Sequence, residues 1–237
     1  FLNPHRAPRF SRTSAALRAS GFSLVEMMVV LAIISVVTSI ALLGQGEFNR
    51  SILLTDTAYT VALSLREMQT YGLSSRKFNA TQNAGYGAYV TSATTGSYVL
   101  FADTADADTV DRNTYATSCL FGGTGTPESK PGDCIYTPGS DGIVQTYAFS
   151  RGFRISSFCG KNGAAKYCST DGTTPLTEMN IVFLRSNTET AVLAKRNGVW
   201  TPLTSAELYL QSYDGSGTKG ICVSRVGQIS VTNGTCL

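Results

Sequence analysis

FSLVEMMVVLAIISVVTSIALL, residues 22–43, decides the fold of this chain because it is apolar along almost its whole length. As a helix with about 1.5 Å rise per residue, such a run spans the hydrocarbon core of a bilayer. Glu26 is its only charged residue. A carboxylate inside a membrane helix costs about 3 kcal/mol on insertion scales, so Glu26 is a candidate functional residue that needs a partner.

A basic segment precedes the apolar run and ends in Gly21. Residues 1–21 contain no acidic residue and hold the only histidine of the chain, His5. Their arginines are Arg6, Arg9, Arg12 and Arg18. Positive residues beside an apolar helix stay on the cytoplasmic side of a membrane, so this segment predicts the orientation of the chain and does not indicate nucleic-acid binding.

The stretch Gly21-Phe22-Ser-Leu-Val-Glu26 closely resembles the cleavage motif of type IV prepilins and of type II secretion pseudopilins. The resemblance implies that a membrane peptidase, which is also a methyltransferase, cuts between Gly21 and Phe22 and methylates the amine of Phe22. It also implies that Glu26, the fifth mature residue, pairs with that amine on a neighbouring subunit as a filament grows. Two opposite charges compensate each other in a low dielectric, whereas either one alone would stay buried and unpaired.

Two simpler interpretations share some of these features. An ordinary secretory signal also has a basic and an apolar region, but it is cut after the apolar region at a small-x-small site. A plain single-pass anchor explains the apolar length and the arginines. Neither explains Gly21 before Phe22 or the position of Glu26, so we favour the prepilin interpretation.

The charge balance changes once the leader is set aside. Removing four arginines from a chain with 19 Lys and Arg and 16 Asp and Glu leaves a formal charge of −1. Removing His5 leaves no histidine, so Ser-His-Asp catalysis, Cys-His catalysis and His-ligated zinc are excluded for the mature chain. The sequence shows no phosphate loop or nucleophile elbow either, and we expect neither an enzyme nor a cofactor.

Residues 44–75 continue the helical pattern after an interruption at Gly44-Gln-Gly46. The two glycines weaken a helix by about 1 kcal/mol each. The pilin resemblance implies a helix that partly unwinds here in the filament, and the simpler interpretation is a membrane exit loop. Apolar residues then recur at helical spacing, which predicts packing on a head domain. They are Leu54, Ala58, Val61, Leu65 and Met68.

Residues 76–237 have the composition of a β-rich head, with short apolar runs between Gly, Ser, Thr and Asn. The predicted strands are 86–91, 97–102, 143–149, 180–185, 190–195, 206–211, 220–224 and 228–232. A long N-terminal helix followed only by strands predicts an α+β protein in which the helix packs on an antiparallel sheet. This arrangement agrees with the pilin-like fold that the resemblance implies.

The 6 cysteines all lie in the head and predict disulfides formed in an oxidising compartment. Of the many pairings that six cysteines allow, we favour sequence neighbours because each pair would close a loop rich in Gly or Pro. The favoured pairs are Cys119 with Cys134, Cys159 with Cys168, and Cys222 with Cys236. Zinc is the rival interpretation, but no Cys-x-x-Cys occurs.

An acidic cluster in the head is a candidate calcium site, since some pseudopilins bind calcium in a head loop. Its members are Asp103, Asp106, Asp108 and Asp111. Their spacing does not match an EF-hand, and we favour a solvated acidic loop. We therefore expect no bound metal.

The sequence predicts a filament subunit of a type IV pilus or a type II secretion pseudopilus. Its expected partners are other pilin subunits, the prepilin peptidase, the assembly platform of the inner membrane and, before assembly, membrane lipid. We expect the head to be exported and the chain to move from the cytoplasmic membrane into an extracellular or periplasmic filament. The alternative is a tip-located minor pilin whose head binds a surface or DNA; the near balance of charge in the head argues against DNA.

Overall fold

The computed structural model describes residues 21–74, 76–81, 84–104, 132–184 and 189–236. The chain divides into two compact units, Phe1–Gly46 and Glu47–Leu237. One helix and, within the described residues, eleven strands make up the structure. The predicted fold class is confirmed, because the protein has an N-terminal apolar helix and antiparallel sheets in a pilin-like α+β arrangement.

The helix α1 spans Leu24–Leu73. It runs through Gly44-Gln-Gly46 as a helix, so the membrane exit loop considered from the sequence is absent at these residues. Near its end, Gly72 lies against strand β6 (Leu176–Phe183): a Cβ added to Gly72 would come within 2.4 Å of the carbonyl oxygen of Phe183. Glycine is needed there because any side chain would push the helix away from the strand.

The first sheet has six strands in the order β3-β2-β1-β6-β7-β8. Besides β6, these are β1 (Gly85–Thr91), β2 (Ser97–Asp103), β3 (Gly142–Ala148), β7 (Thr190–Arg196) and β8 (Val199–Leu203). All neighbouring strands pair antiparallel.

The second sheet has five strands in the order β11-β10-β9-β4-β5. They are β4 (Arg154–Asn162), β5 (Ala165–Cys168), β9 (Ser205–Gln211), β10 (Thr218–Ser224) and β11 (Ile229–Asn233). All pairs are again antiparallel. The predicted antiparallel strands thus divide between two sheets, a division that the sequence did not specify.

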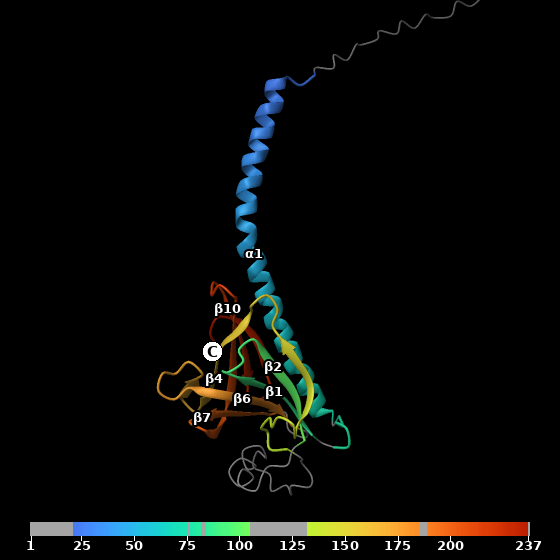
Figure 1. Ribbon diagram of the computed structural model, residues 1–237, viewed down its shortest axis with the longest axis vertical. Helices are drawn as coiled ribbons and strands as arrows, with labels where there is room; N and C mark the ends of the chain where they lie inside the picture. Colours follow the sequence, from blue (N-terminus) through green and yellow to red (C-terminus); the bar gives the residue numbers. More distant parts are fainter. Residues whose placement is uncertain (1–20, 75, 82–83, 105–131, 185–188, 237) are drawn as a thin grey trace, which may run out of the picture. The chain divides into compact units, whose positions relative to one another are not determined.

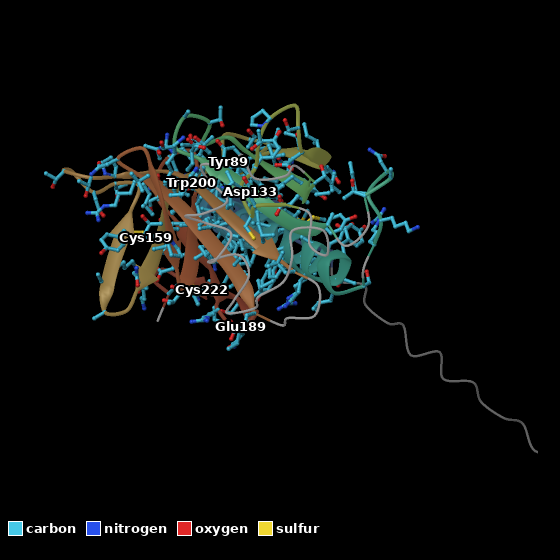
Figure 2. All side chains as sticks on the ribbon, turned by 90° about the horizontal axis from the view of Figure 1, so that it is seen from below. Tyr89, Asp133, Cys159, Glu189, Trp200 and Cys222 are labelled. Carbon is cyan, nitrogen blue, oxygen red and sulfur yellow. A yellow bond between two sulfur atoms is a disulfide. The ribbon has the colours of Figure 1, made fainter. Side chains whose placement is uncertain are left out.

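One hydrophobic core joins both sheets to the head half of α1 (Figure 1). The apolar stripe predicted for the helix is buried in it, with exposed fractions of 0–3% for Leu54, Ala58, Val61, Leu65 and Met68. A smaller cluster lies on the opposite face of the first sheet, where Tyr89 and Trp200 pack at its margin (Figure 2). The head half of α1 is thus an integral part of the head core.

Candidate functional site

The predicted cleavage residues precede the helix and lie open to solvent. Gly21 and Phe22 come before the first residue of α1, Leu24, and the side chain of Phe22 is 77% exposed. A Cβ added to Gly21 would meet no atom within 4 Å. Within the described part of the chain, no packing requirement therefore selects glycine at this position.

Ser23 caps the N-terminus of α1. The backbone N–H of Glu26 donates to the Ser23 hydroxyl at 3.2 Å, and the N–H of Met27 donates to the Ser23 carbonyl oxygen at 3.2 Å. A Glu three residues after a Ser N-cap is the spacing of a capping box, and an acidic side chain in the first turn also favours the helix dipole. Glu26 therefore also stabilises the start of the helix. A test of assembly must distinguish this effect from the pairing of Glu26 with the amine of Phe22.

Residues Leu24–Leu42 of α1 form a helix that is long and apolar enough to cross a membrane. Their mean hydropathy is 2.4, and none of them is buried within the structure. The run contains one acid, Glu26, in its first turn. An apolar helix of this length that is exposed within the described residues requires lipid or another protein around it.

The head half of α1 also carries large apolar side chains that its own core does not use. Phe48, Ile52, Tyr59 and Leu63 are 71%, 49%, 54% and 61% exposed. Their spacings of four, seven and four residues place them on one side of a helix. We call these four residues the outer apolar face of α1. The buried stripe was predicted from the sequence, whereas this face was not.

These features define an α+β protein whose solvent-exposed apolar helix has an acid in its first turn. Residues 17–42 match the family described as "Prokaryotic N-terminal methylation motif", the signature of type IV pilins and pseudopilins. The matched range includes Gly21, Phe22 and Glu26 and excludes the head. No curated protein and no solved structure matches the chain. Residues 17–42 therefore carry the N-terminal methylation motif that is typical of type IV prepilins and pseudopilins, and the apolar helix that follows is consistent with a membrane-anchored chain.

Two disulfides join the cysteine pairs that we favoured from the sequence. Cys159 and Cys168 lie opposite each other on β4 and β5, and Cys222 of β10 is bonded to Cys236 near the end of the chain. Cys134 is also disulfide-bonded, but its expected partner Cys119 lies outside the described residues. No cysteine within the described part of the chain is free.

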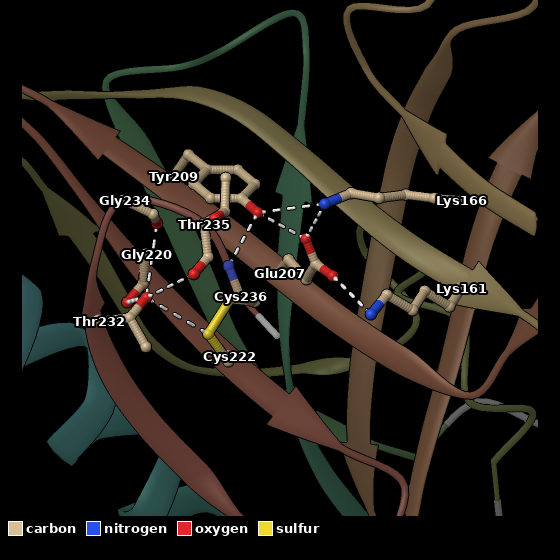
Figure 3. Close-up of a disulfide and its surroundings, with 10 residues drawn as sticks. All are labelled: Lys161, Lys166, Glu207, Tyr209, Gly220, Cys222, Thr232, Gly234, Thr235 and Cys236. Atoms are coloured by element: carbon tan, nitrogen blue, oxygen red, sulfur yellow. Dashed lines mark hydrogen bonds and ion pairs between the residues drawn. A yellow bond between two sulfur atoms is a disulfide. The ribbon is translucent and has the colours of Figure 1, made fainter.

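A buried acid, which sequence reasoning missed, lies between these two disulfides in the second sheet. Glu207 on β9 pairs in register with Cys159 and Cys222 and is 2% exposed. Its carboxylate accepts hydrogen bonds from Lys166 and from Tyr209 at 2.6 Å (Figure 3).

Burial alone would lower the pKa of Lys166, but its hydrogen bonds to Glu207 and Tyr209 outweigh burial and leave the pKa raised. The Tyr209 hydroxyl also accepts from the N–H of Cys236 at 3.3 Å (Figure 3). This network ties the end of the chain to β9 and β5, which is a structural role.

Of the predicted acidic cluster, only Asp103 lies within the described residues. Asp106, Asp108 and Asp111 lie outside them. Asp103 is fully buried, so the expected solvated loop is wrong for this residue. Its carboxylate accepts hydrogen bonds from the backbone N–H groups of Asp133 and Cys134 at 3.1 and 2.7 Å.

The pKa of Asp103 is raised well above its usual value, first by burial and then by repulsion from Asp133 and Asp141. The two backbone hydrogen bonds oppose this shift. No group of three candidate metal ligands occurs among the described residues.

Proposed function

We propose that this chain is a structural subunit of a type IV pilus or a type II secretion pseudopilus. The prepilin peptidase cleaves between Gly21 and Phe22 and methylates the new amine. Before assembly the chain sits in the cytoplasmic membrane with its head exported, and it then enters a filament through the inner-membrane platform. Glu26 pairs with the amine of Phe22 on a neighbouring subunit.

The observation that carries this proposal is the coincidence of the methylation motif with the start of α1. The motif ends at residue 42, where the membrane-length segment also ends. Cleavage after Gly21 would leave Phe22 directly before the N-cap residue Ser23, with Glu26 in the first turn. The charged amine and its proposed partner would thus lie at the same end of the helix.

The outer apolar face of α1 supports assembly through more than the membrane segment. Exposed Tyr59 and Leu63 lie on the same helix as buried Val61 and Leu65, so this part of α1 has two apolar sides. The inner side fills the head core. The outer side is suited to packing against the helix of another subunit, where mutual burial replaces contact with water.

This function implies a division of the chain into four parts. Residues 1–21 are the leader, and residues 22–43 are first a membrane helix and then part of the filament core. Residues 44–75 carry the helix into the head, and residues 76–237 form the β-rich, disulfide-bonded head. The two compact units meet after Gly46, close to the proposed boundary.

The proposal is tested by expressing the full chain with and without a prepilin peptidase and measuring intact mass and N-terminal sequence. We expect a product that begins with methylated Phe22 only when the peptidase is present. Gly21→Ala should stay uncleaved although it folds normally, because the added methyl group meets no atom within 4 Å.

The matched control is Gly96→Ala, which also adds a methyl group where nothing lies within 4 Å and should be cleaved normally. A wild-type chain that stays intact with an active peptidase, or that is cut beyond Leu43, would contradict the proposal. It would then be an ordinary anchored or secreted protein.

A further inference from the structure

A cavity of about 350 Å³ lies in the head, beside the start of its helical part. Its lining comes from the head half of α1, from the turn between β9 and β10, and from β10 and β11. The lining residues include Arg50, Ser51, Thr218, Lys219 and Asn233. No Asp or Glu is among the lining residues within the described chain. The cavity is therefore rich in hydrogen-bond donors and in positive charge.

Lys219 is a cation of this cavity that pairs with no acid among the described residues. Its ammonium group donates to the side-chain oxygen of Asn233, which is a neutral group. Within the described residues it forms no ion pair, in contrast to Lys166, Lys195 and Arg225. An ammonium group can donate three hydrogen bonds, so Lys219 keeps donors for a ligand.

Asp214 positions Arg50, the other cation that lines the cavity. This carboxylate pairs with Arg50 and accepts hydrogen bonds from the hydroxyls of Ser212 and Ser216 at 2.7 and 2.8 Å. Asp214 thereby holds Arg50 against the turn between β9 and β10. Arg50 and the two serine hydroxyls compensate the negative charge of Asp214. These interactions orient the Arg50 side chain in the absence of a ligand, and such pre-organisation lowers the entropic cost of binding.

Further donors are unused at the rim. Ser51, Thr218 and Asn233 line the cavity, and the described residues show no hydrogen bond donated by their side chains; Asn233 accepts from Lys219 through its oxygen. Ammonium, hydroxyl and amide donors without a competing carboxylate suit an oxyanion. The volume leaves room for a polar group attached to that anion.

We propose that this cavity binds a phosphoryl group carried by a small polyol, such as glycerol phosphate, with Lys219 as the principal contact. The same chemistry occurs in a free phosphorylated polyol and in the headgroup of phosphatidylglycerol. This site goes beyond the role of the chain as a filament subunit and does not depend on cleavage at Gly21.

The binding test uses the full chain in an uncharged detergent, titrated with glycerol 3-phosphate and followed by calorimetry and phosphorus NMR. We expect binding that glycerol alone does not reproduce. Lys219→Gln should weaken it at least about tenfold, because a charge-assisted hydrogen bond is lost. Lys219→Arg, which keeps the charge, should retain most of the affinity.

Lys77→Gln is the matched control, because Lys77 is exposed and does not line the cavity. It should bind like wild type. An unchanged unfolding midpoint in each variant shows that the head remains folded. Equal affinity of wild type and Lys219→Gln, or no binding by the wild type, would overturn the proposal.

The source of the phosphoryl group is distinguished in bilayer nanodiscs of phosphatidylcholine with and without phosphatidylglycerol. Native mass spectrometry then counts the lipids retained on the released chain. Retention of phosphatidylglycerol that Lys219→Gln abolishes identifies the headgroup as the ligand. Binding of glycerol 3-phosphate without such retention identifies a free phosphorylated polyol.

Discussion

Ser64 of α1 and Tyr98 of β2 share a buried hydrogen bond of 2.9 Å between their hydroxyl groups. The Ser64 hydroxyl also donates to the carbonyl oxygen of Val61 at 2.8 Å. A serine hydroxyl has one proton, so Tyr98 must be the donor to Ser64. The bond joins the helix to the first sheet inside the core, where both side chains are less than 5% exposed.

This geometry predicts a loss of stability in alkaline solution. Burial raises the pKa of Tyr98 from 10.0 to about 12, while the Ser64 hydroxyl, which can turn to donate a hydrogen bond to the ionised phenolate, lowers it in part. Above pH 10 the unfolded chain releases this proton and the folded chain keeps it, so stability present below pH 10 is lost as the pH rises toward 12. The loss is at most roughly 3 kcal/mol, since each pKa unit corresponds to about 1.4 kcal/mol.

The measurement is denaturant unfolding in an uncharged detergent across this pH range. Tyr98→Phe should flatten the alkaline decrease relative to wild type. Ser64→Ala should extend the decrease to higher pH, because it removes the interaction that lowers the Tyr98 pKa. Identical pH profiles for wild type and Tyr98→Phe would contradict the assigned shift.

The positions of most strands could be predicted because each is a short run with apolar residues that is bounded by residues typical of turns. Three strands were missed, each for a physical reason. β4 contains Ser, Gly, Lys and Asn, and β5 is only 4 residues long. β8 contains Pro202, which a strand tolerates here because β8 forms an edge of its sheet.

The division into two sheets and the burial of Glu207 could not be read from local sequence. Both depend on which strands become neighbours, and β9 pairs with β4, about fifty residues earlier in the chain, according to their registers. Glu207 is buried because β9 lies at the centre of its sheet, between β10 and β4. By contrast, the methylation motif could be recognised at once, since its residues are contiguous.

The role of Glu26 in assembly can be separated from its role at the helix start. Glu26→Ala should leave membrane insertion intact and strongly reduce filament incorporation, because the amine of Phe22 loses its partner. Ser23→Ala removes the hydroxyl that caps the helix and should cost about 1 kcal/mol of helix stability. It keeps the carboxylate, so incorporation should remain near wild type.

The readout is the amount of subunit in sheared or purified filaments relative to the amount in the membrane. Normal incorporation of Glu26→Ala would rule out the proposed charge pair. If Ser23→Ala reduced incorporation as much as Glu26→Ala, the effect of Glu26 would be assigned to helix capping.

The outer apolar face of α1 should matter for assembly and not for folding. We expect the double variant Tyr59→Ser, Leu63→Ser to change the free energy of unfolding by less than about 0.5 kcal/mol per site, since both side chains are mostly exposed. It should nevertheless reduce the filament fraction. Thr60→Ala, an exposed change on the same helix, should have little effect on either quantity.

Leu65→Ala gives the opposite pattern and serves as the contrast. Its side chain is fully buried, so truncation should destabilise the head by about 3 kcal/mol. Thermal unfolding and filament pelleting, measured on the same samples, separate the two effects. If the double variant formed filaments normally, the outer apolar face of α1 would not be needed for assembly, and this prediction would be wrong.

The disulfide between Cys222 and Cys236 should stabilise the head mainly by restricting the unfolded chain. It closes a loop with a sequence separation of 14. A loop of this length corresponds to about 3 kcal/mol in the chain-entropy model. Replacing both cysteines by Ser should lower the free energy of unfolding by about that amount, measured by denaturant unfolding under oxidising conditions.

The matched control for this pair is the double replacement of Cys159 and Cys168, which closes a shorter loop with a separation of 9. The entropic effect grows slowly with loop length, so its loss should be slightly smaller. The Cys236 N–H also donates to Tyr209, which contacts Glu207, so freeing the chain end removes a further interaction. A larger loss at the shorter loop would contradict the entropic account and point to packing around β4 and β5 instead.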